Sequence, residues 1–386
     1  MKIGRTLAGV ALVVIVCGAS RTETSLPARA ETSLPAQPQG VPWPTAEWPQ
    51  GRPDADPAAL TRATEEIFSA TGRGGLPDTR ALLAVQGGRL VLERYAQGFG
   101  PDSRFRSWSM AKSVTQALVG ILVREGRLSL DAPAPVPAWQ SAGDPRAALT
   151  LRHLLTMTSG LDNADGGESA GSFVARLLFG DLSADSAAGA AQVALVYAPG
   201  THWAYSTATT QIVSGIVARK VGGGRDGVRD FLARELATPL GARSLLVEFD
   251  AAGTPLGGGY VFATARDWAR LGTLYLRDGI WNGARVLPDG WVEFSRTVAP
   301  ASNNGVYGAH FWVNGDPTEE QFRPLRQGLE AFEMSGNGGQ FVVIVPDRDL
   351  VVVRLGEMQR VTWSQLGDEL SDLVAAFPAR AAAAQP

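Results

Sequence analysis

The chain has 386 residues, of which 45% are hydrophobic and ten are tryptophan, so its composition is that of a folded globular protein. Its formal net charge of −3 gives no electrostatic basis for binding nucleic acid. Three His and one Cys, without His-x-x-x-His or Cys-x-x-Cys spacing, argue against a metal centre. We therefore expect neither a metal nor any other cofactor.

The N-terminal segment is typical of an export signal. Lys2 and Arg5 give a basic start, and the apolar stretch at 6–19 is shorter than the ~20 residues of a membrane-spanning helix. Ala28-Arg29-Ala30 offers a cleavage site with small residues on both sides. As an alternative, Cys17 could carry a lipid anchor, although the residue before it is not small. In either case we expect a periplasmic or extracellular protein without a membrane span.

A linker is expected after the export signal, which covers residues 1–30. Residues 31–56 are rich in proline and continue a hexapeptide, Glu-Thr-Ser-Leu-Pro-Ala, that occurs twice. Such composition favours an extended, unpacked tether. One folded domain is expected over 57–386, with a mainly helical insert at roughly 125–260.

The first predicted elements are a helix and a hairpin. Pro57 suits a first helical turn, and the apolar residues that follow form one stripe, at positions 60, 63, 67 and 68. Two β-rich runs, 81–86 and 89–95, flank Gly87-Gly88. Strand-like runs around a Gly-Gly pair predict a β-hairpin.

A helix is predicted to start at Ser109 and to run to about Arg124. Residues 150–290 favour helices and loops. A second hairpin is predicted from 341–345 and 350–354, and a helix at 362–377 follows it. Strands at both ends of the chain around a helical middle indicate an α+β fold, with an antiparallel sheet flanked by helices and a mainly helical insert.

Ser109 and Lys112 carry the strongest chemical signal. Only three lysines occur in the chain, Lys2, Lys112 and Lys220, and one of them lies three residues after a serine. This spacing puts a hydroxyl and an amine on one helical face, one turn apart. It is the arrangement that a nucleophile with an adjacent base requires, so we predict Ser109 as nucleophile and Lys112 as general base.

Tyr205 and a glycine-rich segment complete the candidate site. A tyrosine near a buried ammonium can pass a proton to a leaving group, so Tyr205 is the candidate acid. The backbone N–H of Ser109, at a helix N-terminus, is one candidate donor to an oxyanion. The second donor is expected in Ser335-Gly336-Asn337-Gly338-Gly339-Gln340, where glycines let the backbone approach a substrate.

The ordered motifs resemble the serine β-lactamase and penicillin-binding-protein group, in particular its class C-like branch of esterases, D-aminopeptidases and 6-aminohexanoate-dimer hydrolases. Besides Ser-x-x-Lys, the similar segments are Glu125 to Asp131, Leu149 to Leu161, Ala198 to Thr201 before Tyr205, and Thr264 to Arg270. Together they span roughly residues 60–376. The resemblance implies a β-lactamase/transpeptidase-like fold and an acyl-enzyme on Ser109. It also implies that the Asn337 N–H, between Gly336 and Gly338, is the second oxyanion donor.

Two positions depart from the pattern of that group. Thr207 stands where the Tyr-x-Asn motif has Asn, and Met334-Ser335-Gly336 stands where Lys-Thr-Gly or His-x-Gly is usual. The missing cation normally helps to hold a substrate carboxylate. We therefore expect a serine hydrolase of small amides or esters. The alternatives are a β-lactamase or D-stereospecific peptidase of the same fold, and a non-catalytic binder of cell-wall peptides.

Other polar residues are interpreted as structural. His153 is expected to satisfy a buried hydrogen bond, and His202 and His310 are expected in structural or rim positions. Asp162 and Asp165 could contact a substrate amine, but solvated loop acids are the simpler interpretation.

Overall fold

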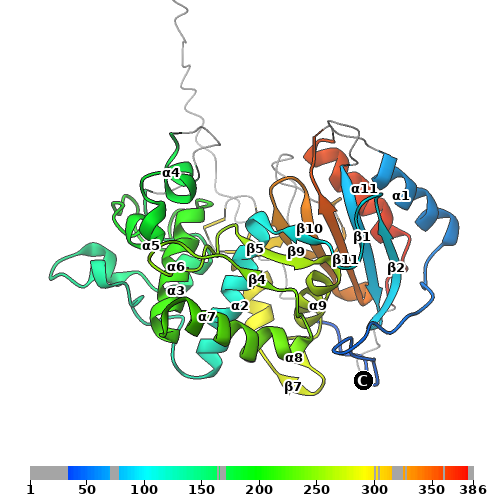
Figure 1. Ribbon diagram of the computed structural model, residues 1–386, viewed down its shortest axis with the longest axis horizontal. Coiled ribbons are helices and arrows are strands. Elements are labelled where there is room, and N and C mark those ends of the chain that lie inside the picture. Colours follow the sequence, from blue (N-terminus) through cyan, green and yellow to red (C-terminus); the bar gives the residue numbers. More distant parts are fainter. Residues whose placement is uncertain are drawn as a thin grey trace, which may run out of the picture. The chain divides into compact units, whose positions relative to one another are not determined.

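The computed structural model describes residues 34–69, 78–162, 165, 171–299, 301–302, 305–314, 325–326, 328–359 and 361–380. In this part of the chain a six-stranded antiparallel sheet has the order β2-β1-β11-β10-β9-β8 (Figure 1). Its strands, in that order, are Arg89–Tyr95, Thr79–Gln86, Leu350–Gly356, Gln340–Val345, Phe332–Gly336 and Trp312–Val313. A smaller sheet has the order β3-β5-β4, formed by Arg104–Arg106, Val261–Thr264 and Leu246–Val247, and β6 (Ile280–Trp281) pairs with β7 (Ala284–Arg285).

Helices cover both faces of the large sheet (Figure 1). Most of the other helices lie between β3 and β8 in the sequence. The α-helices of the described residues, from α1 to α11, are Pro57–Ser69, Ala111–Arg124, Leu151–Leu155, Phe173–Phe179, Ser186–Ala190, Thr207–Val221, Gly224–Leu232, Thr238–Leu240, Ala265–Leu276, Trp291–Arg296 and Trp363–Ala375. This is the α+β arrangement that the sequence predicted, with β1 and β2 from one end of the chain and β9 to β11 from the other.

The large sheet buries both of its faces, which explains its long apolar runs. Alternate residues of a strand point to opposite faces. In β1, Leu82 and Ala84 belong to a core with α1 and α11, whereas Leu83 and Val85 belong to the larger core that includes α2 and α9. The predicted hairpins are β1–β2 and β10–β11, and the predicted C-terminal helix is α11. The large sheet and α2 therefore share one core, which fixes where α2 begins.

Residues 34–56 differ from the expected unpacked tether. Trp48 is 7% exposed, and the Trp43 ring lies 5.2 Å from the Trp281 ring. The Trp281 Nε1 donates to Thr45 Oγ1, and the Gly51 N–H donates to the Leu90 carbonyl oxygen at the edge of β2. The tryptophans of this segment bury apolar surface on the domain, which the proline-rich composition did not indicate. The predicted export signal, including Cys17, lies outside the described residues.

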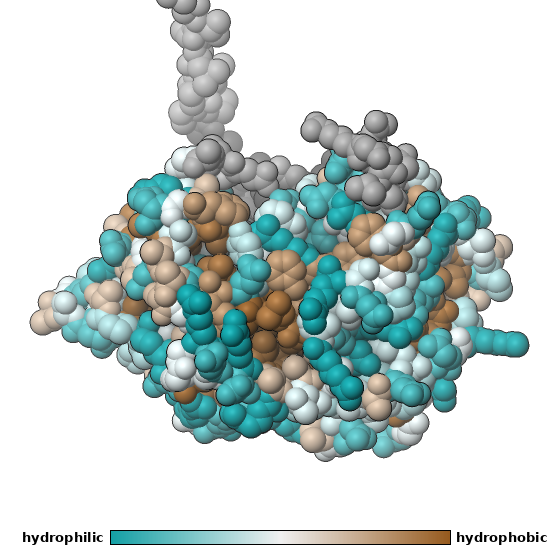
Figure 2. All heavy atoms as spheres, in the orientation of Figure 1, coloured by the Kyte–Doolittle hydropathy of each residue, from teal (hydrophilic) through white to brown (hydrophobic). Residues whose placement is uncertain are grey.

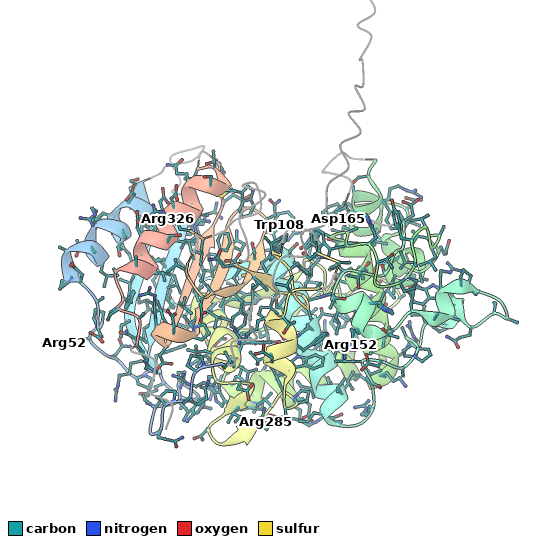
Figure 3. The ribbon with its side chains drawn as sticks, turned by 180° about the vertical axis from the view of Figure 1, so that it is seen from behind. Arg52, Trp108, Arg152, Asp165, Arg285 and Arg326 are labelled. Carbon is teal, nitrogen blue, oxygen red and sulfur yellow. The ribbon has the colours of Figure 1, made fainter. Side chains whose placement is uncertain are left out.

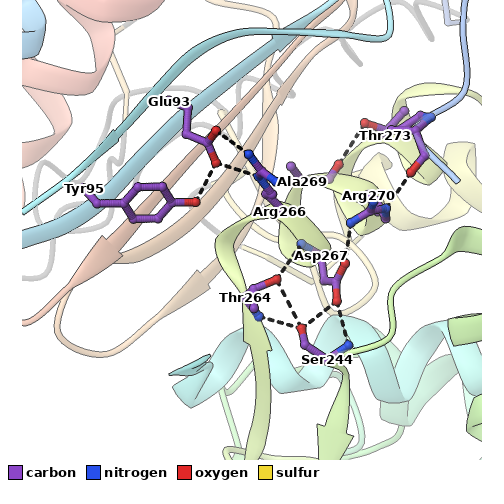
Figure 4. A network of polar contacts seen from close by, with 10 residues as sticks. Glu93, Tyr95, Ser244, Thr264, Arg266, Asp267, Ala269, Arg270 and Thr273 are labelled. Atoms are coloured by element: carbon purple, nitrogen blue, oxygen red, sulfur yellow. Dashed lines mark hydrogen bonds and ion pairs between the residues drawn. The ribbon is translucent and has the colours of Figure 1, made fainter. Parts of the chain in front are cut away.

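A polar network fixes the start of α9 (Figure 4). Thr264 is the N-cap of this helix and accepts a hydrogen bond from the Asp267 backbone. Asp267 accepts from the hydroxyl of Ser244 and forms a buried ion pair with Arg270. Arg266 forms a two-bond ion pair with Glu93 of β2. The segment around Thr264 to Arg270 thus has a structural role, because it ties α9 to the large sheet.

No helix within the described ranges is both long and apolar enough to cross a membrane.

Candidate active site

Ser109 lies on a short turn between β3 and α2. Trp108–Met110 forms one turn of 3-10 helix before α2 begins at Ala111. Trp108 has a left-handed backbone, with φ of 47°, which is uncommon for a residue with a side chain and marks local strain. The Arg106 guanidinium stacks 3.6 Å from the Trp108 ring and 3.9 Å from the Tyr260 ring. These contacts hold the turn that presents Ser109.

Lys112 is buried in the first turn of α2, at 1% exposure. Its Nζ lies 3.0 Å from Ser109 Oγ, 3.0 Å from Thr207 Oγ1 and 3.0 Å from the Gly258 carbonyl oxygen. Burial lowers the pKa of Lys112 to about 8, and the charge of Asp165 opposes that shift. The amine can therefore lose its proton at mildly basic pH, as a general base must.

Tyr205 lies just before α6 and faces the same two residues. The Lys112 Nζ is 4.8 Å from the centre of its ring. Burial raises the pKa of Tyr205, while a hydrogen bond with Ser109 acts in the opposite direction. The ring packs against Tyr307 and Trp312, with centroid distances of 5.8 and 5.4 Å. This aromatic support orients the hydroxyl, which stays protonated and can donate.

Gly336 brings the end of β9 against the Ser109 turn. A Cβ atom at this position would lie 2.2 Å from the Ser107 carbonyl oxygen and 3.2 Å from the Ser109 nitrogen. Only glycine allows this approach. The Gly338 N–H donates to Asn337 Oδ1, so Gly338 supports the loop. Gly336 and Asn337 line the cavity beside Ser109, as the expected oxyanion segment should.

Arg354 of β11 holds this loop from behind. The side chain is fully buried and donates to the carbonyl oxygens of Gly338 and Gly339, at 3.1 and 2.7 Å. It also donates to Thr79 Oγ1 and to the Asp78 carbonyl oxygen. Burial lowers the pKa of Arg354 to about 10, which leaves it charged at neutral pH. The glycine loop is thus anchored to the large sheet.

A cavity of about 480 Å³ opens over Ser109. Figure 3 shows Trp108 and Asp165, two of its wall residues, beside each other where the sheet strands meet the helical part. One face of α4 also lines it, and apolar side chains are visible over α4 in Figure 2. The apolar wall residues are Trp108, Val174, Ala175, Leu178, Phe179, Trp312 and Trp363, of which Phe179 is 64% exposed. Such a wall suits a substrate with an apolar group.

The structure brings Ser109, Lys112, Tyr205, Gly336 and Asn337 together, and Met334 is buried in the core. The histidines have other surroundings. His153 completes the N-terminal cap of α3 with Thr150, and His202 stacks on Tyr197. His310 is buried between the Leu155 carbonyl and Thr210, and burial lowers its pKa to about 3.

Sequence reasoning missed three contributors. Asp165, interpreted as a solvated acid, accepts two hydrogen bonds from Thr207 and lines the cavity. Gly258 supplies an acceptor to Lys112, and the run Gly257-Gly258-Gly259 was the available signal for a close backbone approach. Arg106 is a cavity cation three residues before Ser109. Its position three residues before Ser109 does not indicate that it stacks on the rings of Trp108 and Tyr260.

The comparisons with known proteins agree with this geometry. The family described as Beta-lactamase matches residues 79–369. This chain belongs to the beta-lactamase family. Within that family, the chain is 28% identical over 304 residues to a 6-aminohexanoate-dimer hydrolase of Paenarthrobacter ureafaciens, covering 72% of each chain. It is 33% identical over 215 residues to the esterase EstB of Burkholderia gladioli, covering 49% of this chain and 52% of the esterase.

A solved structure shows the same family fold. A Bacillus anthracis protein, provisionally named a 6-aminohexanoate-dimer hydrolase, superposes with a TM-score of 0.67 at 21% identity. The superposition covers 85% of this chain and 86% of the other. The chain is therefore a beta-lactamase-fold protein whose relatives by sequence are named as an amide hydrolase and an esterase.

Proposed function

We propose that this protein is a serine hydrolase of small amides or esters that acts through an acyl-enzyme on Ser109. The observation that carries the proposal is the 3.0 Å contact between Lys112 Nζ and Ser109 Oγ, made by a lysine whose pKa burial lowers to about 8. A hydroxyl beside a neutral amine is an activated nucleophile. The names of the two sequence relatives supply the substrate class.

In the acylation step, Ser109 Oγ forms a bond to the carbonyl carbon of the substrate. The proton of the Ser109 hydroxyl passes to Lys112 Nζ, and the π electrons of the carbonyl move onto its oxygen. The backbone N–H groups of Ser109 and Asn337 stabilise this oxyanion. When the intermediate collapses, the bond to the leaving group breaks. Tyr205 donates its proton to the leaving amine or alcohol and regains one from the Lys112 ammonium.

Deacylation uses the same groups in the reverse order. A water molecule gives a proton to the basic pair of Lys112 and Tyr205, and its oxygen attacks the acyl carbon. The second oxyanion forms and collapses, the bond to Ser109 Oγ breaks, and Ser109 recovers a proton from the same pair. The products are a carboxylic acid and the free enzyme.

Labelling tests the nucleophile. A fluorophosphonate probe is expected to add one label to the wild-type protein, at Ser109, and none to Ser109→Ala. The same variant should lose hydrolysis of p-nitrophenyl acetate. Full ester turnover by folded Ser109→Ala would overturn the proposal. Intact mass after incubation with a panel of esters, amides and β-lactams would show which substrates acylate Ser109.

Two related activities are separated by the same panel. A β-lactamase would turn over nitrocefin, for which we expect little or no turnover, because Met334 is buried where the family usually has a cation. A D-stereospecific peptidase would cleave peptides of D-residues faster than simple esters. A non-catalytic binder of cell-wall peptides would bind without acylation, and the presence of Ser109, Lys112 and Tyr205 in mutual contact argues against it.

We also infer that the enzyme acts outside the cytoplasm, as the basic and apolar N-terminal segment indicates. N-terminal sequencing of the exported protein should give a start at Glu31. A lipid-modified Cys17 at the N-terminus would instead establish the anchored form, and an intact Met1 start in the cytoplasm would contradict export.

A further inference from the structure

We propose that Asp165 is a positioning residue, which fixes the direction of the hydrogen bonds around Lys112 so that the lone pair of the neutral amine faces Ser109. This inference rests on the proposed function, because it concerns the same proton transfer. It gives Asp165 a role without substrate contact, acting through the hydroxyl of Thr207.

Asp165 is tied to the start of α6 by three hydrogen bonds. Its Oδ1 accepts from the Thr207 backbone N–H at 2.8 Å, and its Oδ2 accepts from the Thr207 hydroxyl at 2.6 Å. Its own N–H donates to the Tyr205 carbonyl at 3.0 Å. A carboxylate at a helix N-terminus is favoured by the helix dipole. These contacts fix both oxygens of the carboxylate relative to Thr207.

A count of hydrogens then sets the direction of each bond. An ionised carboxylate only accepts, so the single hydrogen of the Thr207 hydroxyl is committed to Asp165. Thr207 Oγ1 must therefore accept from Lys112 Nζ, 3.0 Å away. The Gly258 carbonyl, also 3.0 Å away, can only accept. A neutral amine has two hydrogens and one lone pair, and both hydrogens are now used.

Among the residues that the structure describes, the third hydrogen-bond neighbour of Lys112 Nζ is Ser109 Oγ, at 3.0 Å. The lone pair of the neutral amine is therefore the group that faces the Ser109 hydroxyl, which is the orientation needed to accept its proton. If the Thr207 hydroxyl pointed the other way, it would donate to Lys112 and occupy this lone pair. Asp165 prevents that reversal.

The departure at position 207 explains why an additional acid is needed. By resemblance, the family has Asn at this position, whose side-chain oxygen can only accept from the lysine. A threonine hydroxyl can donate or accept, so its direction has to be imposed. In this chain Thr207 is 5% exposed, and the acid that directs it comes from a segment 42 residues earlier.

The charge of Asp165 also acts on Lys112. The titratable groups that interact with the amine in the described part of the chain are Asp165, Tyr205 and His310. Of these, Asp165 raises the pKa of Lys112 against the larger effect of burial. Removal of the negative charge should therefore shift the lysine titration to lower pH, which is a readout that a loss of packing alone would not give.

Asp165→Asn in the full-length protein tests the inference. The amide oxygen can keep the Thr207 N–H, but the amide nitrogen then faces the Thr207 hydroxyl and reverses it. With p-nitrophenyl acetate, we expect kcat to fall ~10–100-fold, as for a misplaced catalytic group, with little change in KM. The pH midpoint of kcat should move below that of the wild type. Asp162→Asn, in an exposed acid of the same segment, is the matched control and should change neither value.

The same substitution made in a Thr207→Asn protein makes the test specific. In Thr207→Asn, the amide oxygen needs no direction from Asp165, so adding Asp165→Asn should change kcat by less than ~3-fold. If Asp165→Asn does not fold, Thr207→Ser and Thr207→Val replace it, and only the variant without a hydroxyl should lose activity.

Several results would overturn the inference. They are an unchanged kcat and pH midpoint in folded Asp165→Asn, an equal loss in both backgrounds, or a raised KM at constant kcat, which would indicate substrate contact. If Thr207→Ser and Thr207→Val are used instead, equal activity of the two variants would also overturn the inference. Fluorophosphonate labelling of wild-type Ser109 reports on the proposed function separately, because failure there is independent of Asp165.

Discussion

The Nζ of Lys112 lies 3.0 Å from the Oγ of Ser109, inside a protein core that leaves the lysine 1% exposed. Because burial lowers the pKa of Lys112 to about 8, the amine is mostly protonated at neutral pH and mostly neutral above pH 8. The general base must be unprotonated, so kcat/KM for an ester should rise with pH and level off above about 8. A pH–rate profile measures this directly. A profile that is flat from pH 6 to 10, roughly, would contradict Lys112 as base.

Two substitutions at Lys112 sharpen that prediction. Lys112→Ala should lower kcat/KM at least ~100-fold, within the range for acid–base groups. Lys112→Arg keeps a positive charge but does not deprotonate, so it should be as inactive as alanine at every pH. An active arginine variant would mean that only the charge matters.

Tyr205→Phe should discriminate between leaving groups. The variant removes the proton donor but keeps the ring, which packs on Tyr307 and Trp312. A nitrophenolate leaves without a proton, whereas an amine or alkoxide does not. We expect ~100-fold loss or more for amides and alkyl esters and a smaller loss for p-nitrophenyl esters. Equal losses for both classes, measured by kcat/KM, which reports the acylation step, would argue against Tyr205 as acid.

Gly336→Ala should displace the oxyanion segment. The added Cβ would lie 2.2 Å from the Ser107 carbonyl oxygen, so β9 must move away from Ser109. We expect kcat to fall by ~100-fold or more, the effect of losing one oxyanion donor. Gly100→Ala, at a site with nothing within 4 Å of the new Cβ, is the control and should retain activity. Normal kcat in Gly336→Ala would show that the segment at the end of β9, with the Asn337 N–H, supplies no oxyanion donor.

The apolar wall of α4 should set acyl-chain preference. Leu178 lines the cavity, whereas Arg176 on the same helix pairs with Asp181 outside it. Leu178→Asp should lower the ratio of kcat/KM for p-nitrophenyl octanoate over acetate by ~10-fold or more, because each buried methylene contributes about 0.8 kcal/mol. Arg176→Gln should leave the ratio unchanged. The same ratio in Leu178→Asp as in the wild type would place the acyl group elsewhere.

Much of the fold was predictable because its signals are local. Gly87-Gly88 between two β-rich runs produced the β1–β2 hairpin, and the Thr362 cap gave the start of α11. Residues 34–56 were expected to be unpacked, but Trp43 and Trp48 pack on residues far along the chain. Composition reports chain stiffness and cannot show such contacts.

The sequence by itself determined that Ser109 and Lys112 meet, because residues three apart at the start of a helix share one face. Tyr205 and the glycine-rich segment were candidates from their chemistry, and the resemblance pointed to Asn337 within that segment; the fold brings them to the same cavity. Only the tertiary structure showed which residues Asp165, Gly258 and Arg106 contact. Their contacts with Thr207, Lys112 and Trp108 depend on side-chain direction and on how the core packs, neither of which a local pattern specifies.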